Sequence, residues 1–287
     1  MKVGFVILCY RNFPMIKECV TKLLSLEKIQ ESEIVLVDNC SPDGTGQKLV
    51  EEYERNEIIH VILNEENSGF AKGNNLGYKF AKTKLSCDIQ VVMNSDVFID
   101  DRLFIIKLIK IAEENPTVAI IGPDALGKNG RHTNPLYGGA VSEEYARKNI
   151  SYNNLANLLL KLHIDYYKGK QKKCNANVMQ EKQYNIMPHG CCVIFCPMWI
   201  NKEEQAFWPG TFLFCEEYFL TAYALQCGYK TMYNPELVVR HLGDGSIDTD
   251  TGNERKKRLF INTNQNKSLV KYLEFMKDAK KNWSNQM

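Results

Sequence analysis

Short, uninterrupted runs of apolar residues alternate with polar turns and helical segments through the first part of the chain. The apolar runs are VGFVILC, EIVLVD, IIHVILN, IQVVMN and VAIIGP. Between them, apolar residues at helical spacing predict helices over 14–26, 47–55, 71–82 and 101–114. Strands that are apolar on both faces are covered on both sides, and here they alternate with helices. The pattern therefore predicts an α/β fold with a doubly wound, mostly parallel sheet.

Polar side chains stand where several of these strands end. Tyr10 follows the first run, Asp38 ends the second, and Asn94 and Asp96 follow the fourth. In open parallel sheets, ligands bind in the crevice beyond the carboxyl ends of the strands. A carboxylate at the end of a buried strand is costly to desolvate unless it has a partner, so Asp38 and Asp96 are candidate ligands. The Pro-Asp-Gly sequence at 42–44 is instead typical of a β-turn.

The pattern loosens after residue 126 and becomes regular again near residue 187. The segments MPHGCCVIFCP and FLFCEEYFLTAYALQCGYKTMYNPELVVRH predict a strand, a loop, a helix and a strand. A lysine-rich stretch with a leucine patch occupies 147–182, and a basic helix is predicted from residue 254 onward. Two interpretations stay open for both segments. Each is either an amphipathic surface that contacts a membrane or a partner, or a helix that packs on the core with a solvated basic face.

Composition narrows the class of protein only slightly. A chain of 287 residues can bury the core of one large α/β domain, and a formal net charge of +2 gives no general attraction for nucleic acid. The ten cysteines are scattered through apolar segments, which predicts reduced, packed thiols and neither a disulfide framework nor a zinc site. The chain enters its first strand without a signal-peptide pattern, and no apolar run is long enough to span a membrane, so we expect a cytoplasmic protein.

Two common nucleotide-binding motifs are absent from the sequence. LCYRNFP follows the first strand, where a dinucleotide-binding fold has G-x-G-x-x-G, and GFAKGNNLG lacks the G-K-[ST] of a P-loop. What remains is a sheet edge with isolated carboxylates. Mg²⁺ is often held by one or two protein carboxylates while phosphates and water complete its shell. The sequence therefore predicts a site for a metal-diphosphate group at this edge.

Six segments then occur in a recognisable order: VDNCSPDGT, NEENSGFAKGNNLG, MNSDV, HGCCVIF, FLFCEEYFL and YNPELVVRHLGDGS. Together they resemble the motifs of family 2 glycosyltransferases with the GT-A fold, especially rhamnosyltransferase-like enzymes of bacterial polysaccharide biosynthesis. The resemblance implies a Rossmann-like GT-A catalytic domain over 1–250, with a mostly parallel sheet and a smaller mixed acceptor-side region. Its nucleotide-sugar-binding half is 1–125, and its acceptor-binding half is 126–250 with an insertion at 147–183. Residues 251–287 then form a basic, helical C-terminal tail.

The resemblance also implies a role for each matching residue. The positions that match the nucleotide-sugar-binding motifs are Tyr10, Asp38, Asn67, Gly69, Lys72, Asn74, Asn94 and Asp96. The acceptor and sugar pocket is assigned to His189, Gly190, Trp208 and Glu216. The metal, Mg²⁺ or Mn²⁺, is assigned to Asp96 and His241, and the catalytic base to Glu217. The chain departs from the family at two of these positions, since Asn94 replaces the first aspartate of the D-x-D motif and Glu217 replaces the usual aspartate.

The implied reaction is an inverting transfer of a sugar from a nucleotide-diphosphate donor, dTDP-rhamnose or a UDP-hexose. The implied acceptor is a hydroxyl of a glycan or lipid-linked oligosaccharide in cell-surface polysaccharide synthesis, such as a capsule or O-antigen, with peripheral contact to the inner face of the cell membrane. The residues alone leave open a sugar nucleotidyltransferase, or a non-catalytic saccharide-binding protein of the same fold. Taken singly, Glu216 and Glu217 also fit acidic residues at a helix N-terminus, and His241 fits a structural histidine.

Overall fold

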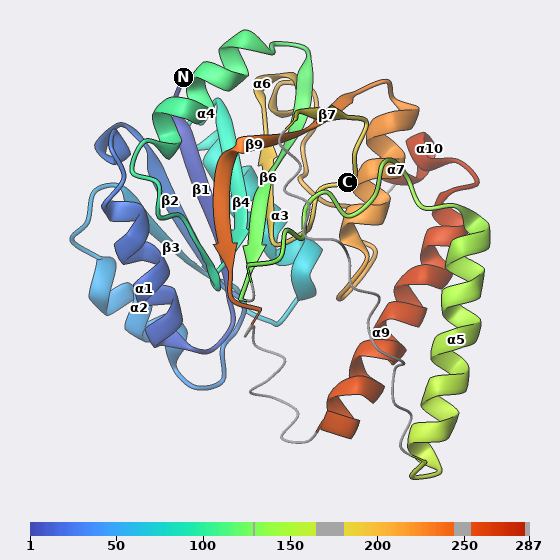
Figure 1. The fold of residues 1–287 in the computed structure, drawn as a ribbon. Helices are drawn as coiled ribbons and strands as arrows, with labels where there is room; N and C mark the ends of the chain where they lie inside the picture. The colour runs from blue at the N-terminus through green and yellow to red at the C-terminus, as the bar shows by residue number, and fades with distance from the viewer. Residues whose placement is uncertain (129, 165–180, 244–253, 285–287) are drawn as a thin grey trace.

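One twisted sheet, covered by helices on both faces, forms the body of the protein (Figure 1). The computed structural model describes residues 1–128, 130–164, 181–243 and 254–284. The sheet has the strand order β3-β2-β1-β4-β8-β6-β9-β5, and β7 pairs with β9. The strands are β1 (Val3–Cys9), β2 (Glu33–Asp38), β3 (Ile59–Leu63), β4 (Ile89–Asn94), β5 (Val97–Phe98), β6 (Val118–Gly127), β7 (Gln183–Tyr184), β8 (Cys192–Phe195) and β9 (Lys230–His241).

The predicted mostly parallel sheet is confirmed, although periodicity did not reveal the antiparallel strand β8 in its middle, and the short strands β5 and β7 also pair antiparallel with β9. Strand β1 pairs in parallel with both β2 and β4, and β6 pairs in parallel with β9. Strand β8 lies antiparallel between β4 and β6, where Ile194 is opposite both Val91 and Ile121. A strand from the second half of the chain thus joins the two halves of the sheet, which brings the turn before β8 to the carboxyl edge of β4.

The helices are α1 (Phe13–Leu24), α2 (Thr45–Tyr53), α3 (Gly69–Thr83), α4 (Phe104–Glu114), α5 (Glu143–Lys161), α6 (Pro197–Ile200), α7 (Glu216–Gln226), α9 (Glu254–Phe275) and α10 (Ala279–Ser284), with a 3₁₀ turn at Ile29–Glu31. The four helices predicted between the first strands are confirmed, with ends that differ by a few residues. Helices α1, α2 and α4 pack with Phe5 and Ile7 on one face of the sheet. Helices α3, α6, α7, α9 and α10 pack on the other face, where Val6 lies.

Helix α3 packs closely on the sheet through its glycines. A Cβ atom at Gly77 would be 2.5 Å from Val6 Cγ1 and 2.9 Å from Val37 Cγ2, and one at Gly73 would be 2.5 Å from Leu8 Cδ1. The glycines of GNNLG therefore allow the helix to approach β1 and β2. This close contact fixes the N-terminus of α3 beside the carboxyl ends of the strands.

The C-terminal helices belong partly to the core and partly to a projecting pair. Figure 1 shows α5 and α9 running side by side away from the sheet, and Asn153 Nδ2 of α5 donates to Asn266 Oδ1 of α9 at 3.0 Å. At the other end, the Trp283 ring of α10 stacks on Tyr223 of α7, with centroids 4.2 Å apart. The C-terminal segment is therefore packed into the domain, and its last helix is fixed by aromatic contacts.

Helix α5 covers the lysine-rich stretch only as far as Lys161, and residues 165–180 lie outside the described residues. The side of α5 with Ala156 and Leu160 is buried, whereas Leu155, Leu158 and Leu162 stay exposed. Packing on the core therefore accounts for only part of its leucine patch. Among the described residues, no helix combines the length and apolar character that a membrane crossing requires.

Candidate active site

A cavity of about 690 Å³ opens at the carboxyl edge of the sheet. The ends of β1 and β4 contribute Tyr10, Asn94 and Asp96. Asn67 comes from the loop before α3, and Gly69 is the first residue of that helix. The opposite wall comes from the turn before β8 and from the loop that leads into α7. Residues from both halves of the chain thus face one space, and Phe260 and Gln265 of α9 also line it.

Asn39 lines the cavity and organises the loops around it, although no sequence motif had assigned it to the site. Its side chain is 3% exposed. Its Nδ2 donates to Asn67 Oδ1 at 2.9 Å and to the Gly69 carbonyl at 3.2 Å. Its Oδ1 accepts hydrogen bonds from Asn64 Nδ2 and from the Ser68 backbone N–H. One buried amide thus holds the loop after β3 against the loop after β2, which sets the position of Asn67.

Gly69 adopts a conformation that a residue with a side chain could not easily replace. Its φ is +83°, and a Cβ atom there would be 2.3 Å from the Phe212 carbonyl oxygen. The next residue, Phe70, donates its backbone N–H to that same oxygen at 2.8 Å. The loop before α3 and the loop before α7 therefore meet directly at the cavity.

Three residues predicted to contact the donor do not line this cavity. Both oxygens of Asp38 are engaged by Ser41, whose hydroxyl and backbone N–H donate to them at 2.5 and 3.0 Å. Lys72 is exposed on α3. Asn74 is buried beneath the loop, where its Nδ2 donates to the Phe70 carbonyl at 3.0 Å. In the structure Asp38 and Asn74 support the walls, and Asn39 takes the position at the cavity.

Strand pairing brings Asp96 and His241 together. Strand β5 pairs with the end of β9, with Val97 opposite His241, so the residue before β5 lies beside this histidine. Asp96 Oδ2 is 3.4 Å from His241 Nε2, and the ring centroids of His189 and His241 are 5.5 Å apart. His189 Nδ1 accepts the Cys191 backbone N–H at 3.0 Å.

These residues fit a divalent cation in their chemistry and spacing. Two neighbouring ligands of a six-coordinate ion, each roughly 2.1 Å from it, are about 3 Å apart, which is close to the separation of Asp96 and His241. The Asp96 carboxylate can bind either Mg²⁺ or Mn²⁺. The His241 imidazole is a better ligand for Mn²⁺ than for Mg²⁺. The donor atoms of His189, Cys191 and His241 also lie within 4.8 Å of one another. Burial, however, raises the pKa of the Cys191 thiol, which disfavours the thiolate that a metal would need.

His189 is held neutral by its surroundings. Burial, together with the charge of His241, lowers its pKa to about 4, and Asp96 only partly opposes this. A neutral imidazole beside Gly190 leaves this wall without positive charge of its own near neutral pH. The wall therefore places no fixed cation against the carboxyl group of Glu217.

Glu216 and Glu217 form the first turn of α7, and both line the cavity. A Cβ atom at Gly190 would be 3.3 Å from Glu217 Oε2, so the absence of a side chain leaves space at this carboxylate. Burial raises the pKa of Glu217 to about 7. Burial and then the charge of Glu217 raise the pKa of Glu216 to about 8, while Thr211 donates its hydroxyl to Glu216 Oε1 at 3.3 Å. A carboxyl group that ionises near neutrality is suited to accept a proton during catalysis.

Trp208, which the resemblance assigned to the acceptor and sugar pocket, is not among the described residues that line the cavity. Its ring stacks on Phe219 with centroids 4.6 Å apart, and its Nε1 donates to the Asn282 carbonyl at 3.0 Å. Phe275 also packs against the indole, and the Trp208 side chain is buried. The loop residues that reach the cavity in its place are Phe212, Leu213, Phe214 and Tyr218. Their position next to the Glu216–Glu217 pair in the sequence was the available signal.

Comparisons with known proteins point in one direction. Residues 5–176, more than half of the chain, match the family model described as Glycosyl transferase family 2. Poly-beta-1,6-N-acetyl-D-glucosamine synthase of Staphylococcus aureus (strain COL) is 30% identical over 98 residues, which are 34% of this chain and 22% of the relative. The uncharacterized glycosyltransferase EpsJ of Bacillus subtilis (strain 168) is 29% identical over 80 residues, 28% of this chain and 23% of the relative. The matches thus span less than a quarter of the length of these relatives.

Two solved structures share the fold at low sequence identity. The mannosyltransferase PcManGT from Pyrobaculum calidifontis, in complex with GDP-Man and Mn²⁺, has a TM-score of 0.54 and 14% identity, with 99% of this chain and 73% of that chain covered. GalNAc-T7 with UDP, GalNAc and Mn²⁺ has a TM-score of 0.58 and 15% identity, with 84% and 44% covered. These likenesses concern the fold. With a family model over more than half of its length and the sheet described above, the chain belongs to glycosyl transferase family 2 and has the GT-A fold.

Proposed function

We propose that the protein transfers a sugar from a nucleotide-diphosphate sugar to a hydroxyl group of a glycan acceptor, with inversion at the anomeric carbon. One observation carries the proposal. Asp96, from the nucleotide side of the sheet, and Glu217, from the acceptor side, line the same cavity. Its volume of about 690 Å³ falls within the usual range for small-molecule sites.

Glu217 acts as the general base in this reaction. As the acceptor oxygen forms its bond to the anomeric carbon, its proton passes to the Glu217 carboxylate. The bond from the anomeric carbon to the diphosphate oxygen breaks, and its electron pair leaves with the nucleoside diphosphate. Attack from the face opposite the leaving group produces inversion in one displacement. The raised pKa of Glu217 supports this role, since it keeps the carboxylate basic enough to accept a proton near neutral pH.

The donor is held by the part of the cavity beside β1 and β4. Tyr10, Asn67 and Asn94 offer an aromatic ring and two amides there, and Gly69 lets the backbone approach closely. The donor class stays broad. A dTDP-sugar or UDP-hexose fits the sequence motifs, and the name of the Staphylococcus relative adds N-acetylglucosamine to the sugars to be tested.

Asp96 and His241 would hold Mg²⁺ or Mn²⁺ at the diphosphate. A bound divalent cation supplies charge neutralisation for the departing diphosphate. His189, neutral near pH 7, orients the turn next to Gly190 through its contact with the Cys191 backbone. Replacing Asp96 with alanine should abolish the Mn²⁺-dependent part of nucleotide binding. Mn²⁺-dependent binding that is as strong as in the wild type would exclude Asp96 as a ligand.

The acceptor is a growing glycan or a lipid-linked oligosaccharide at the inner face of the cell membrane, in the synthesis of a cell-surface polysaccharide. The names of the Staphylococcus and Bacillus relatives support a glycan product and a transferase activity. The exposed leucines of α5 support contact with an amphiphilic acceptor or a membrane surface.

A panel of nucleotide sugars tests the function directly. Donors that bind should raise the melting temperature in the presence of Mn²⁺, and release of the nucleoside diphosphate with a saccharide acceptor measures transfer. Glu217→Gln should lower turnover by about 10²-fold or more while donor binding persists. The exposed Glu57 supplies a matched control, since Glu57→Gln makes the same chemical change outside the cavity. Binding without turnover for every donor would support a saccharide-binding protein, and near-normal turnover in Glu217→Gln would remove this residue from the mechanism.

A further inference from the structure

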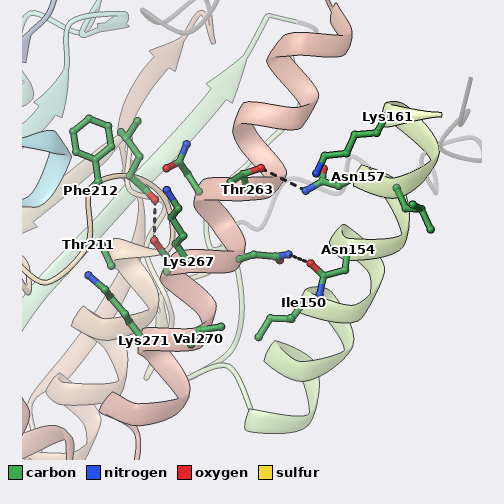
Figure 2. A pocket seen from close by; sticks show the side chains of 15 residues that line it. Ile150, Asn154, Asn157, Lys161, Thr211, Phe212, Thr263, Lys267, Val270 and Lys271 are labelled. Carbon is green, nitrogen blue, oxygen red and sulfur yellow. Dashed lines mark hydrogen bonds between the residues drawn. The ribbon is translucent and has the colours of Figure 1, made fainter. Parts of the chain in front are cut away.

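A second hollow, of about 740 Å³, lies between α5, α9 and the loop that leads into α7 (Figure 2). It is distinct from the cavity that contains Glu217. Its two long walls come from helices that are far apart in the sequence. Figure 2 shows Lys161 reaching from α5 toward α9 across the upper part of this groove.

The charge of this groove, which we call the α5–α9 groove, has one sign. Lys161, Lys267 and Lys271 line it, and no acidic residue is among its described lining residues. Lys271 donates to the Gly210 carbonyl. Within the described part of the chain, Lys161 and Lys267 form no ion pair with a carboxylate, and both side chains are exposed. The net charge of the whole chain is only +2, so three lysines without an acid form a local concentration of positive charge.

The remaining lining combines amides with exposed apolar side chains. Asn157 Oδ1 accepts from Asn262 at 3.0 Å, and Asn154 Oδ1 accepts from Asn266 at 2.8 Å, so these contacts hold the two walls together. Leu158 is 53% exposed at the groove. Amide groups donate and accept hydrogen bonds as sugar hydroxyls do, whereas lysines provide charge for an anion. This mixture suits a molecule that carries both hydroxyl groups and phosphate.

The α5–α9 groove adjoins the catalytic cavity across one loop. Phe212 and Leu213 line both spaces. The loop is held on the cavity side by the hydrogen bond from the Phe70 N–H to the Phe212 carbonyl. On the groove side, the Ser268 hydroxyl donates to the Leu213 carbonyl at 2.9 Å. A ligand in the groove therefore lies next to the space in front of Glu217, with the exposed Phe212 ring between them.

We propose that the α5–α9 groove binds the phosphate-bearing end of a glycan acceptor while the acceptor sugar extends over Phe212 into the cavity. This inference rests on the proposed transferase function and names its acceptor class, a sugar that carries a phosphate or diphosphate. A concave wall with lysines on both helices favours a discrete anionic group over a flat membrane surface. The donor diphosphate is accounted for separately, on the Asp96 side of the cavity.

Titration calorimetry with glucose 1-phosphate, and with methyl glucoside as the neutral counterpart, tests the groove without requiring turnover. The phosphate should bind the wild type more tightly than the glucoside does. Lys161→Ala/Lys267→Ala should weaken it at least tenfold, since hydrogen bonds between charged groups are among the stronger ones. Lys148→Ala/Lys277→Ala removes the same charge from the exposed ion pairs with Glu144 and Glu274 and should leave binding unchanged. Equal weakening in both double variants would mean general electrostatic attraction and would overturn the inference.

Asp96→Ala locates the bound phosphate. Binding that persists in Asp96→Ala but is lost in Lys161→Ala/Lys267→Ala supports the groove, whereas the reverse places the probe in the donor cavity and overturns the inference. Vesicles of phosphatidylglycerol and phosphatidylcholine provide the membrane comparison. If the groove variant loses vesicle binding while the wild type does not bind glucose 1-phosphate, the lysines serve a membrane surface instead. The transferase mechanism is tested by a different measurement: near-normal turnover in Glu217→Gln would contradict it without affecting the binding results for the groove.

Discussion

Replacing Glu217 with glutamine should make the protein more stable at alkaline pH while it removes activity. Burial raises the pKa of Glu217 from 4.5 to about 7 in the folded protein. Below pH 4.5 the carboxyl group is protonated in both the folded and the unfolded state, so its titration contributes nothing. As the pH rises from 4.5 to 7, the unfolded chain releases the proton while the folded protein retains it, and the free energy of unfolding therefore falls.

The size of this effect follows from the pKa difference. About 2.5 pH units, at 1.36 kcal/mol each, amount to roughly 3 kcal/mol above pH 7. This is an upper value, because part of the side chain faces the cavity. The glutamine side chain has no such proton to release. The Glu217→Gln variant should therefore exceed the wild type by less than about 1 kcal/mol at pH 5 and by up to about 3 kcal/mol at pH 8. Loss of the Glu217 charge also removes one cause of the raised pKa of Glu216. The lower pKa of Glu216 further increases the stability of the variant at alkaline pH.

Urea unfolding at pH 5 and pH 8, without nucleotide or metal, measures the difference. Thermal unfolding gives a second measure, with roughly 2 °C expected for each kcal/mol in a chain of this size. The exposed control Glu57→Gln should show no pH-dependent gain. A Glu217→Gln variant whose stability relative to the wild type is the same at both pH values would refute the claim that folding opposes ionisation of this carboxylate.

Three other predictions concern the site and its support. In the wild type, kcat/KM should rise about tenfold for each pH unit up to about pH 7 and then level off, because Glu217 must be ionised to accept a proton. A profile that levels off already near pH 4.5 would contradict this role. Gly77→Ala should lower the free energy of unfolding by roughly 1–3 kcal/mol in urea titrations, because the added Cβ meets Val6 and Val37, and an unchanged midpoint would mean that α3 moves away without cost. Trp208→Ala should cost about 3–5 kcal/mol of stability, since the ring is buried against Phe219, whereas a selective rise in the KM for a sugar would restore Trp208 to the pocket.

Local patterns were sufficient for the first half of the fold. The strands β1, β2 and β4 are buried on both faces, and their uninterrupted apolar runs correctly predicted central strands of the sheet. The sequence pattern did not predict that β8 runs antiparallel between β4 and β6. CVIF reads as a buried strand in either direction and beside any neighbour, because its four residues are all buried. Strand direction depends on the connections around it and on pairing with β4 and β6, which no short segment encodes.

In the candidate site, too, some residues could be identified from sequence motifs, while the surroundings of others depend on the tertiary structure. Ordered motifs identified Asp96, Glu217 and His189, and these lie at or beside one cavity. Trp208 looked equally suitable as an isolated aromatic residue in a loop. Its environment is decided by α9 and α10, which supply Phe275 and the Asn282 carbonyl from the end of the chain.

The sequence by itself determined the alternation of strands and helices, the placing of polar residues at strand ends and the family to which the chain belongs. Each of these depends on the order of residues along the chain and on the local burial of a segment. Only the tertiary structure decided that β8 lies antiparallel between β4 and β6, that Asn39 and not Asp38 reaches the cavity, and that α5 and α9 enclose a second, basic groove. These relations depend on strand register and on packing between distant segments, and the free energy that selects them belongs to the whole fold and to no single stretch of sequence.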